Sequence, residues 1–69
     1  MDKGKEYLQV NLPPYLQEDI LNLEEGIKHN LIHRMDVLYG ELRSSINVAV
    51  NSNRITEEQA VYLREKYLN

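Results

Sequence analysis

The stretch NSNRITEEQA, from Asn51 to Ala60, carries the clearest local signal in this chain. Thr56 followed three residues later by Gln59 matches a capping box, in which each side chain bonds the backbone N–H of the other residue. Two glutamates follow Thr56, at the positive end of the helix dipole that favours them. The preceding Asn and Ser residues are typical of a turn. The stretch therefore predicts a tight joint and then a helix over residues 56–68.

The same stretch also looks like the second half of an EF-hand calcium loop. With Ile55 at the aliphatic position of such a loop, Val48 and Val50 fall where oxygen ligands are needed. Gln59 falls where a bidentate glutamate is needed. A cation that requires about six to eight oxygen ligands would find almost none here. The structural interpretation is therefore preferred, and no calcium is expected.

Two further helices are predicted upstream, because apolar residues recur there at spacings of three and four. They are expected over residues 13–29 and 31–51, with Asn30 between them in a left-handed conformation. Their apolar stripes consist of Leu16, Ile20, Leu23 and Ile27 in the first, and of Ile32, Met35, Tyr39, Leu42, Ile46 and Ala49 in the second. Short connections make neighbouring helices antiparallel, so the predicted fold is all-α, a small up-down-up three-helix bundle.

Gly40 lies in the middle of the second predicted helix, where glycine costs about 1 kcal/mol relative to alanine. Gly40 and Ser44 are both small and are four residues apart. The preferred interpretation is that another helix approaches closely across this face. A flexible hinge is the alternative.

The N-terminal part of the chain has a different pattern. Leu8, Val10 and Leu12 alternate with polar residues, which is the period of an extended segment. An extended arm is therefore predicted over residues 7–12, after a flexible tail over residues 1–6. No second strand pattern follows, so the arm either packs on its own bundle, the preferred interpretation, or pairs with another chain.

Size and composition limit the classes of protein. The chain has 69 residues, which indicates a single domain over residues 1–69, and it has no cysteine for a disulfide or thiolate metal site. Its net charge of −3 argues against nucleic-acid binding, which depends on basic residues to neutralise phosphates. No signal-peptide pattern or membrane-length apolar run is found, so a cytoplasmic protein with no membrane contact is expected.

Candidate metal and catalytic residues are few. His29, His33 and Asp36 have spacings that could hold zinc on one continuous helix, but the break expected at Asn30 separates the two histidines. Nucleophilic catalysis needs a serine or cysteine beside a base, and no such motif is found. We therefore expect no enzyme, no cofactor and no metal site.

The aromatic residues point to an interaction surface. The chain has five tyrosines and neither phenylalanine nor tryptophan. Tyr7, Tyr15 and Tyr62 lie off the predicted apolar stripes, and Val61 precedes Tyr62 on the side of the last helix expected to face outward. Exposed tyrosine is enriched in protein interfaces. These four residues are the predicted partner-binding residues.

A basic patch is the competing candidate. Arg54, Arg64 and Lys66 gather around the last predicted helix, which follows a short turn as in a helix-turn-helix protein. However, the first turn of that helix holds Glu57 and Glu58, where a recognition helix usually reads bases. Nucleic-acid binding is therefore kept only as the alternative.

The C-terminal half also carries a family-like pattern. LYGELRSSINVAV over residues 38–50, followed by RITEEQAVYLREKYL over residues 54–68, resembles small uncharacterised helical proteins of Gram-positive bacteria. NLPPYLQEDILNLEEGI over residues 11–27 fits the looser first half of the pattern. Genes of such proteins often lie on conjugative transposons. The resemblance implies a bacterial protein carried by a mobile element, and it brings no catalytic or binding residues.

The leading functional hypothesis is therefore a small non-enzymatic interaction protein. It would bind a protein partner or a second copy of itself through an apolar, tyrosine-bearing face. The alternative hypothesis is a nucleic-acid accessory factor of a mobile genetic element that uses the three basic residues.

Overall fold

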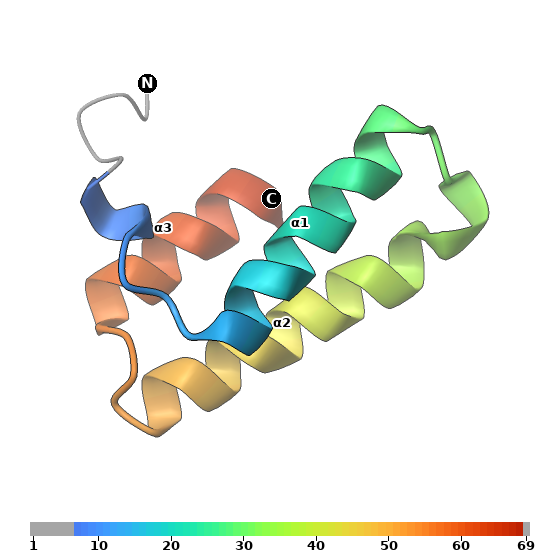
Figure 1. Ribbon diagram of the computed structural model, residues 1–69. Coiled ribbons are helices and arrows are strands. Elements are labelled where there is room, and N and C mark those ends of the chain that lie inside the picture. The colour runs from blue at the N-terminus through green and yellow to red at the C-terminus, as the bar shows by residue number, and fades with distance from the viewer. Residues whose placement is uncertain (1–6, 69) are drawn as a thin grey trace.

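A computed structural model describes residues 7–68, which form three α-helices and no strand (Figure 1). Helix α1 spans Pro14–Lys28, α2 spans Met35–Asn51 and α3 spans Glu57–Tyr67. A short 3-10 helix, η2, spans Ile32–Arg34 and leads directly into α2. The predicted all-α three-helix fold is confirmed. The predicted tail over residues 1–6 lies outside the described residues.

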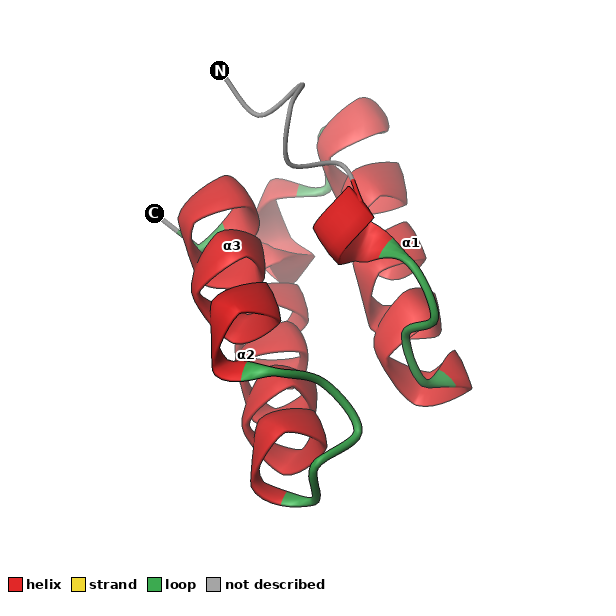
Figure 2. Cartoon of the chain, turned by 90° about the vertical axis from the view of Figure 1, so that its left-hand side faces the viewer, coloured by secondary structure: helices red, strands yellow, loops and turns green. Residues whose placement is uncertain are grey.

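The three helices are arranged as a helical hairpin with a shorter third helix. Helices α1 and α2 form the hairpin, and α3 folds back along α2 (Figure 1). Figure 2 shows the N-terminal arm between α1 and α3, on the side of the molecule away from α2. The arm therefore closes a gap that three helices alone would leave open.

Aliphatic side chains from every element form one core. The largest fully buried side chains are Leu16, Leu23, Leu42, Ile46 and Leu63, which come from all three α-helices. Leu8 and Leu12 of the arm complete the same cluster. Each buried aliphatic side chain removes apolar surface from water, and this contributes about 1.5–3 kcal/mol per side chain. The arm is therefore part of the core of its own chain, as preferred from the sequence.

The arm is not the extended segment that its alternating pattern predicts. Residues 7–9 form one turn of 3-10 helix, and the backbone then bends through Val10 and Asn11. Asn11 has a φ of 57°, which breaks the alternation, so Val10 is exposed while Leu8 and Leu12 are buried. Packing against two helices has overridden the local pattern here.

An asparagine in the left-handed conformation lies at each of the three joints of the chain. Asn11 precedes α1, Asn30 follows α1 and Asn53 follows α2, with φ angles of 57°, 58° and 61°. Asparagine tolerates this conformation better than other residues with a Cβ, because its short polar side chain can bond locally. The left-handed conformation predicted for Asn30 is confirmed.

The capping box predicted for the third helix is confirmed. The Thr56 side chain accepts a hydrogen bond from the Gln59 backbone N–H at 3.1 Å. The Gln59 side chain accepts one from the Thr56 backbone N–H at 2.8 Å. The same Gln59 amide donates through Nε2 to the carbonyl oxygens of Leu8 at 3.0 Å and Val10 at 3.4 Å. One side chain therefore caps α3 and holds the arm.

The close helix approach lies at Gly26, and the approach predicted at Gly40 is wrong. A Cβ added at Gly26 would lie 2.6 Å from Leu38 Cδ1 and 3.4 Å from Met35 Sδ. A Cβ added at Gly40 would meet nothing within 4 Å. Gly26 thus allows α1 and α2 to approach near the end of the hairpin, whereas Gly40 lies on an open face of α2.

We expect the two glycines to respond differently to alanine. Gly40→Ala should raise the free energy of unfolding by about 0.5–1 kcal/mol, because alanine favours the helix and there is room for its methyl group. The free energy of unfolding of Gly26→Ala should be lower than that of Gly40→Ala by about 1 kcal/mol or more, because the added methyl group crowds Leu38. Urea unfolding of both variants measures the difference. Equal stabilisation by both would contradict the close approach at Gly26.

A second pair of variants separates the cap from the arm. Thr56→Ala should cost about 0.5–2 kcal/mol through loss of the cap. Gln59→Glu keeps an acceptor for the Thr56 N–H but loses the donor to the arm and places a charge beside two carbonyl oxygens. It should therefore increase hydrogen exchange of the arm amides more than Thr56→Ala does. Mass spectrometry measures the hydrogen exchange of the arm amides. Unchanged exchange in Gln59→Glu would contradict the role of this side chain in holding the arm.

Candidate interaction surfaces

The structure distributes the four predicted partner-binding residues over three elements. Tyr7 lies in the arm, Tyr15 in the first turn of α1 and Val61 in α3, and all three are exposed. Tyr15 lines an open hollow with Asn11, Pro13, Pro14 and Arg54, which neither Tyr7 nor Val61 lines. The sequence therefore identified exposed residues correctly in three cases, but the structure does not bring them into one hollow.

Tyr62 is the exception, and its predicted outward position is wrong. Its side chain is 4% exposed and belongs to the core cluster. The reason is that Tyr62 lies on the side of α3 that faces the arm. Gln59, three residues earlier, and Lys66, four residues later, both bond the arm. An additional element covers a side of α3 that a simple bundle would expose, so Tyr62 is excluded from the surface.

A chain of polar contacts fastens the C-terminal end of α3 to the arm and to α1. Lys66 Nζ donates to Gln9 Oε1 at 2.8 Å, and Gln9 Nε2 donates to the Tyr67 hydroxyl at 2.9 Å. The Tyr67 hydroxyl in turn donates to Glu24 Oε2 at 2.9 Å. The Lys66 ammonium also lies 5.6 Å and 5.3 Å from the ring centres of Tyr62 and Tyr67, within cation–π range.

The basic residues considered for nucleic-acid binding do not form one patch. Arg64 donates to Asn47 Oδ1 of α2 at 2.7 Å, while Lys66 bonds the arm. Residues two apart on a helix point to nearly opposite sides. Arg54 lies in the turn before α3, beside Tyr15. Two of the three cations therefore hold the fold together, on different sides of α3.

The histidines considered for zinc belong to different elements, as expected from the break at Asn30. His29 follows α1 and lies 3.0 Å from Glu25, and His33 lies in η2. Among the described residues, no group of three or more side chains is arranged to hold a metal ion. His29 acts instead as the partner of a carboxylate one turn earlier.

An exposed apolar cluster lies where the sequence placed the ends of two core stripes. Ile27, Leu31 and Ile32 are 57%, 41% and 68% exposed, although Ile27 and Ile32 were predicted to be buried. Together with Met35 they line one hollow at the closed end of the α1–α2 hairpin. We call these four residues the hairpin end. The sequence did not reveal that these residues are exposed. A spacing of three and four residues shows that side chains share one face of a helix, but it does not show how far a neighbouring helix covers that face.

The exposure of the hairpin end has two structural causes. First, the predicted helix over residues 31–51 begins only at Met35, because residues 29–34 form the turn and η2. Second, α3 ends at Tyr67, whose hydroxyl reaches Glu24 on α1. Helices α1 and α2 continue beyond this point without α3 (Figure 1). The signal available in the sequence was the run KHNLIHR over residues 28–34, in which only two residues are apolar and five are polar.

Charged residues of both signs adjoin the hairpin end along the chain, and we call them its rim. Lys28 and Arg34 lie within the turn region, and Glu25 and Asp36 lie just outside it along α1 and α2. All four side chains are exposed. Within residues 7–68 the only ion pair is that between His29 and Glu25, so Lys28, Arg34 and Asp36 form no ion pair there. The rim of the hairpin end therefore has a formal charge of zero, unlike the chain as a whole.

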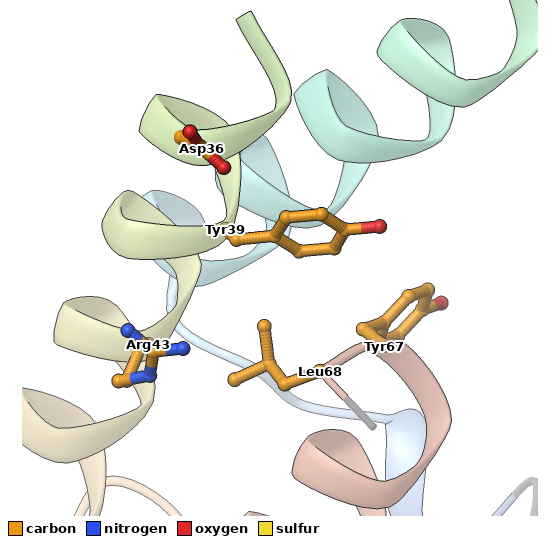
Figure 3. Close-up of a pocket in the computed structure, with 5 residues that line it drawn as sticks. All are labelled: Asp36, Tyr39, Arg43, Tyr67 and Leu68. Atoms are coloured by element: carbon orange, nitrogen blue, oxygen red, sulfur yellow. The ribbon is translucent and has the colours of Figure 1, made fainter. Parts of the chain in front are cut away.

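A third hollow lies between α2 and the C-terminal end of α3. It is lined by Asp36, Tyr39, Arg43, Tyr67 and Leu68 (Figure 3). In this view the Tyr39 ring projects from α2 to the right, where Tyr67 also lies, while Asp36 and Arg43 lie along α2. Asp36 borders both this hollow and the rim of the hairpin end. The uncovered surface of α2 thus continues from the hairpin end to the end of α3.

Burial raises the pKa of Tyr67 above its ordinary value; the hydrogen bond from Gln9 opposes this rise, and the Glu24 carboxylate reinforces it. The pKa of Lys66 is also raised: partial burial lowers it, but the hydrogen bond with Tyr62 and the proximity of Tyr67 outweigh burial. Both groups belong to the contacts that fasten α3.

None of the described helices is both long and apolar enough to cross a membrane. Comparison with known proteins found no matching family model, no matching curated protein and no matching solved structure.

We expect the fold to lose stability at alkaline pH through Tyr67 and Lys66, because the pKa of each is raised in the folded chain. Tyrosine in the unfolded chain loses its proton near pH 10, and Tyr67 in the folded chain does so at higher pH. Stability should thus be complete below about pH 10 and fall as the pH rises further. Urea unfolding between pH 8 and about 11 measures this, and Tyr67→Phe should reduce the slope. An unchanged slope in Tyr67→Phe would contradict the role of this hydroxyl.

Proposed function

We propose that this protein is a small non-enzymatic interaction module that binds another protein or a second copy of itself through exposed apolar side chains. The observation that carries the proposal is the hairpin end, where Ile27, Leu31 and Ile32 are exposed side by side. Such a cluster on a small protein is typical of an interaction site, whereas single exposed aliphatic residues are ordinary.

The fold does not need these side chains for its own core. The core is closed by the arm and three helices, and no buried side-chain polar atom within residues 7–68 lacks a hydrogen-bond partner. The exposed aliphatic residues therefore add solvent-exposed apolar surface without adding core packing. Covering that surface with another chain would remove it from water and favour association.

Tyr7, Tyr15 and Val61 offer additional apolar contact area on other parts of the surface. Tyrosine suits an interface because its ring supplies a large contact area and its hydroxyl tolerates water. The proposed interaction surface is therefore the hairpin end first and these three exposed residues second. Tyr62 is no longer included, because it is buried.

The alternative, a nucleic-acid accessory factor, has less support. Arg64 and Lys66 are engaged within the fold, and Glu57 and Glu58 occupy the first turn of α3. Phosphate binding depends on several free cations that act together. The net charge of −3 also opposes approach to a polyanion.

Site-specific photo-crosslinking in the cells that produce the protein tests the proposal. Benzoylphenylalanine placed at Ile32 should form a covalent protein adduct, because an interface side chain contacts the partner directly. The same residue at Asn22, an exposed polar position of α1, is the matched control and should form none. Mass spectrometry of the adduct separates a second copy from a different protein.

Two outcomes of the crosslinking would count against the proposal. If no adduct forms at Ile32, Tyr7, Tyr15 or Val61, the protein does not act through its exposed apolar residues. Adducts at the tyrosines but not at Ile32 would keep an interaction function and move it away from the hairpin end.

A further inference from the structure

We propose that the hairpin end is a self-recognition surface, at which two copies of this chain pair about a twofold axis. The inference rests on the proposed function, because it identifies the partner for the same exposed apolar cluster. It depends on three features of the described residues: the apolar cluster, the charges on its rim and its position in the fold.

The apolar cluster can be covered by a copy of itself. A twofold axis brings the same surface patch of two subunits together, so each patch must complement itself. Ile27, Leu31 and Ile32 are aliphatic, so paired clusters can exclude water from these side chains. Asn30 lines the same hollow, and its amide can donate and accept hydrogen bonds across the axis. Met35, which lines the same hollow, is half-buried and has a flexible side chain that can adjust to an incoming aliphatic group.

The rim charges favour a second copy over other occupants. Glu25 and Asp36 are acidic, whereas Lys28 and Arg34 are basic, so a rim of this kind can place acids of one copy near bases of the other. A strongly acidic partner, a strongly basic partner or an anionic lipid surface would each meet two like charges. Lys28, Arg34 and Asp36 have no ion-pair partner within residues 7–68, so pairing would not break an existing contact of theirs.

The position of the hairpin end makes the contact accessible. Helices α1 and α2 extend beyond the end of α3, and the arm lies away from the closed end of the hairpin, on the left in Figure 1. A second hairpin end can therefore approach without displacing α3 or the arm. The apolar cluster is small, and interfaces below about 1,200 Å² of total buried area are typical of weak, transient association. We accordingly expect a weak dimer that forms only as the concentration rises.

Sedimentation equilibrium between about 5 µM and 1 mM tests the proposal with the full chain. The weight-average mass of the wild type should rise from 8.1 kDa toward twice that value as concentration increases. Ile32→Glu should dimerise much less, with a dissociation constant at least about tenfold higher than that of wild type. Val48→Glu, the same kind of change at a 56% exposed aliphatic position of α2 outside the proposed interaction surface, is the matched control and should dimerise like wild type. Far-UV circular dichroism establishes that each variant is folded.

A second pair of variants tests the rim charges and does not rely on Ile32. Lys28→Glu with Arg34→Glu makes the rim entirely acidic, and Glu25→Lys with Asp36→Lys makes it entirely basic. Each double variant alone should be monomeric, because like charges face each other across the axis. An equimolar mixture of the two should form heterodimers, because opposite charges then face each other.

The results distinguish this inference from the proposed function. A wild type that is monomeric at 1 mM would overturn self-recognition, while a crosslink from Ile32 to a different protein would preserve the interaction function. Equal loss of dimer in Ile32→Glu and Val48→Glu, or no heterodimer in the rim mixture, would also overturn it. So would a monomer that co-sediments with vesicles of phosphatidylglycerol and phosphatidylcholine in an Ile32-dependent manner, since the occupant would then be a lipid surface.

Discussion

The side chain of Gln59 links the local structure of this protein to its tertiary structure. Its amide oxygen accepts the hydrogen bond that starts α3, and its amide nitrogen donates to two carbonyl oxygens of the N-terminal arm. A helix N-terminus leaves backbone N–H groups without partners, and a bent arm leaves carbonyl oxygens without partners. One amide satisfies both needs, because it has a donor and an acceptor at opposite sides of the same planar group.

The arm matters because the helices are few and short. A domain of this size buries little apolar surface, so the loss of two leucines from the core would be serious. Leu8 and Leu12 enter the core only if the arm is held between α1 and α3. Gln59 holds the arm near the start of α3, and Gln9 joins it to Lys66 and Tyr67 near the end. The arm is thus fixed at two points by neutral and charged hydrogen bonds around an apolar centre.

The same arrangement explains where apolar side chains are left exposed. Helix α3 is shorter than either helix of the hairpin, and its last turn is fastened to α1 at Glu24. The closed end of the hairpin therefore has no third helix over it, although the apolar residues of α1 and α2 continue to that end. A protein that needed only to fold would gain nothing from aliphatic residues there. Their presence beside charges of both signs is the reason to regard the hairpin end as a surface for another chain.

The sequence by itself determined the helix count, the capping box at Thr56, the left-handed Asn30 and the all-α class, because these depend on residues within one turn of one another. It also found three exposed interface candidates, of which Tyr7 and Tyr15 lie off the apolar stripes. Only the tertiary structure decided that Tyr62 is buried, that Gly26 is the point of close approach and that Ile27 and Ile32 are exposed. The physical reason is that burial depends on which distant segment covers a face. Residues 7–12 cover one side of α3, and the end of α3 stops short of the hairpin end; neither fact is encoded in the periodicity of the helices concerned.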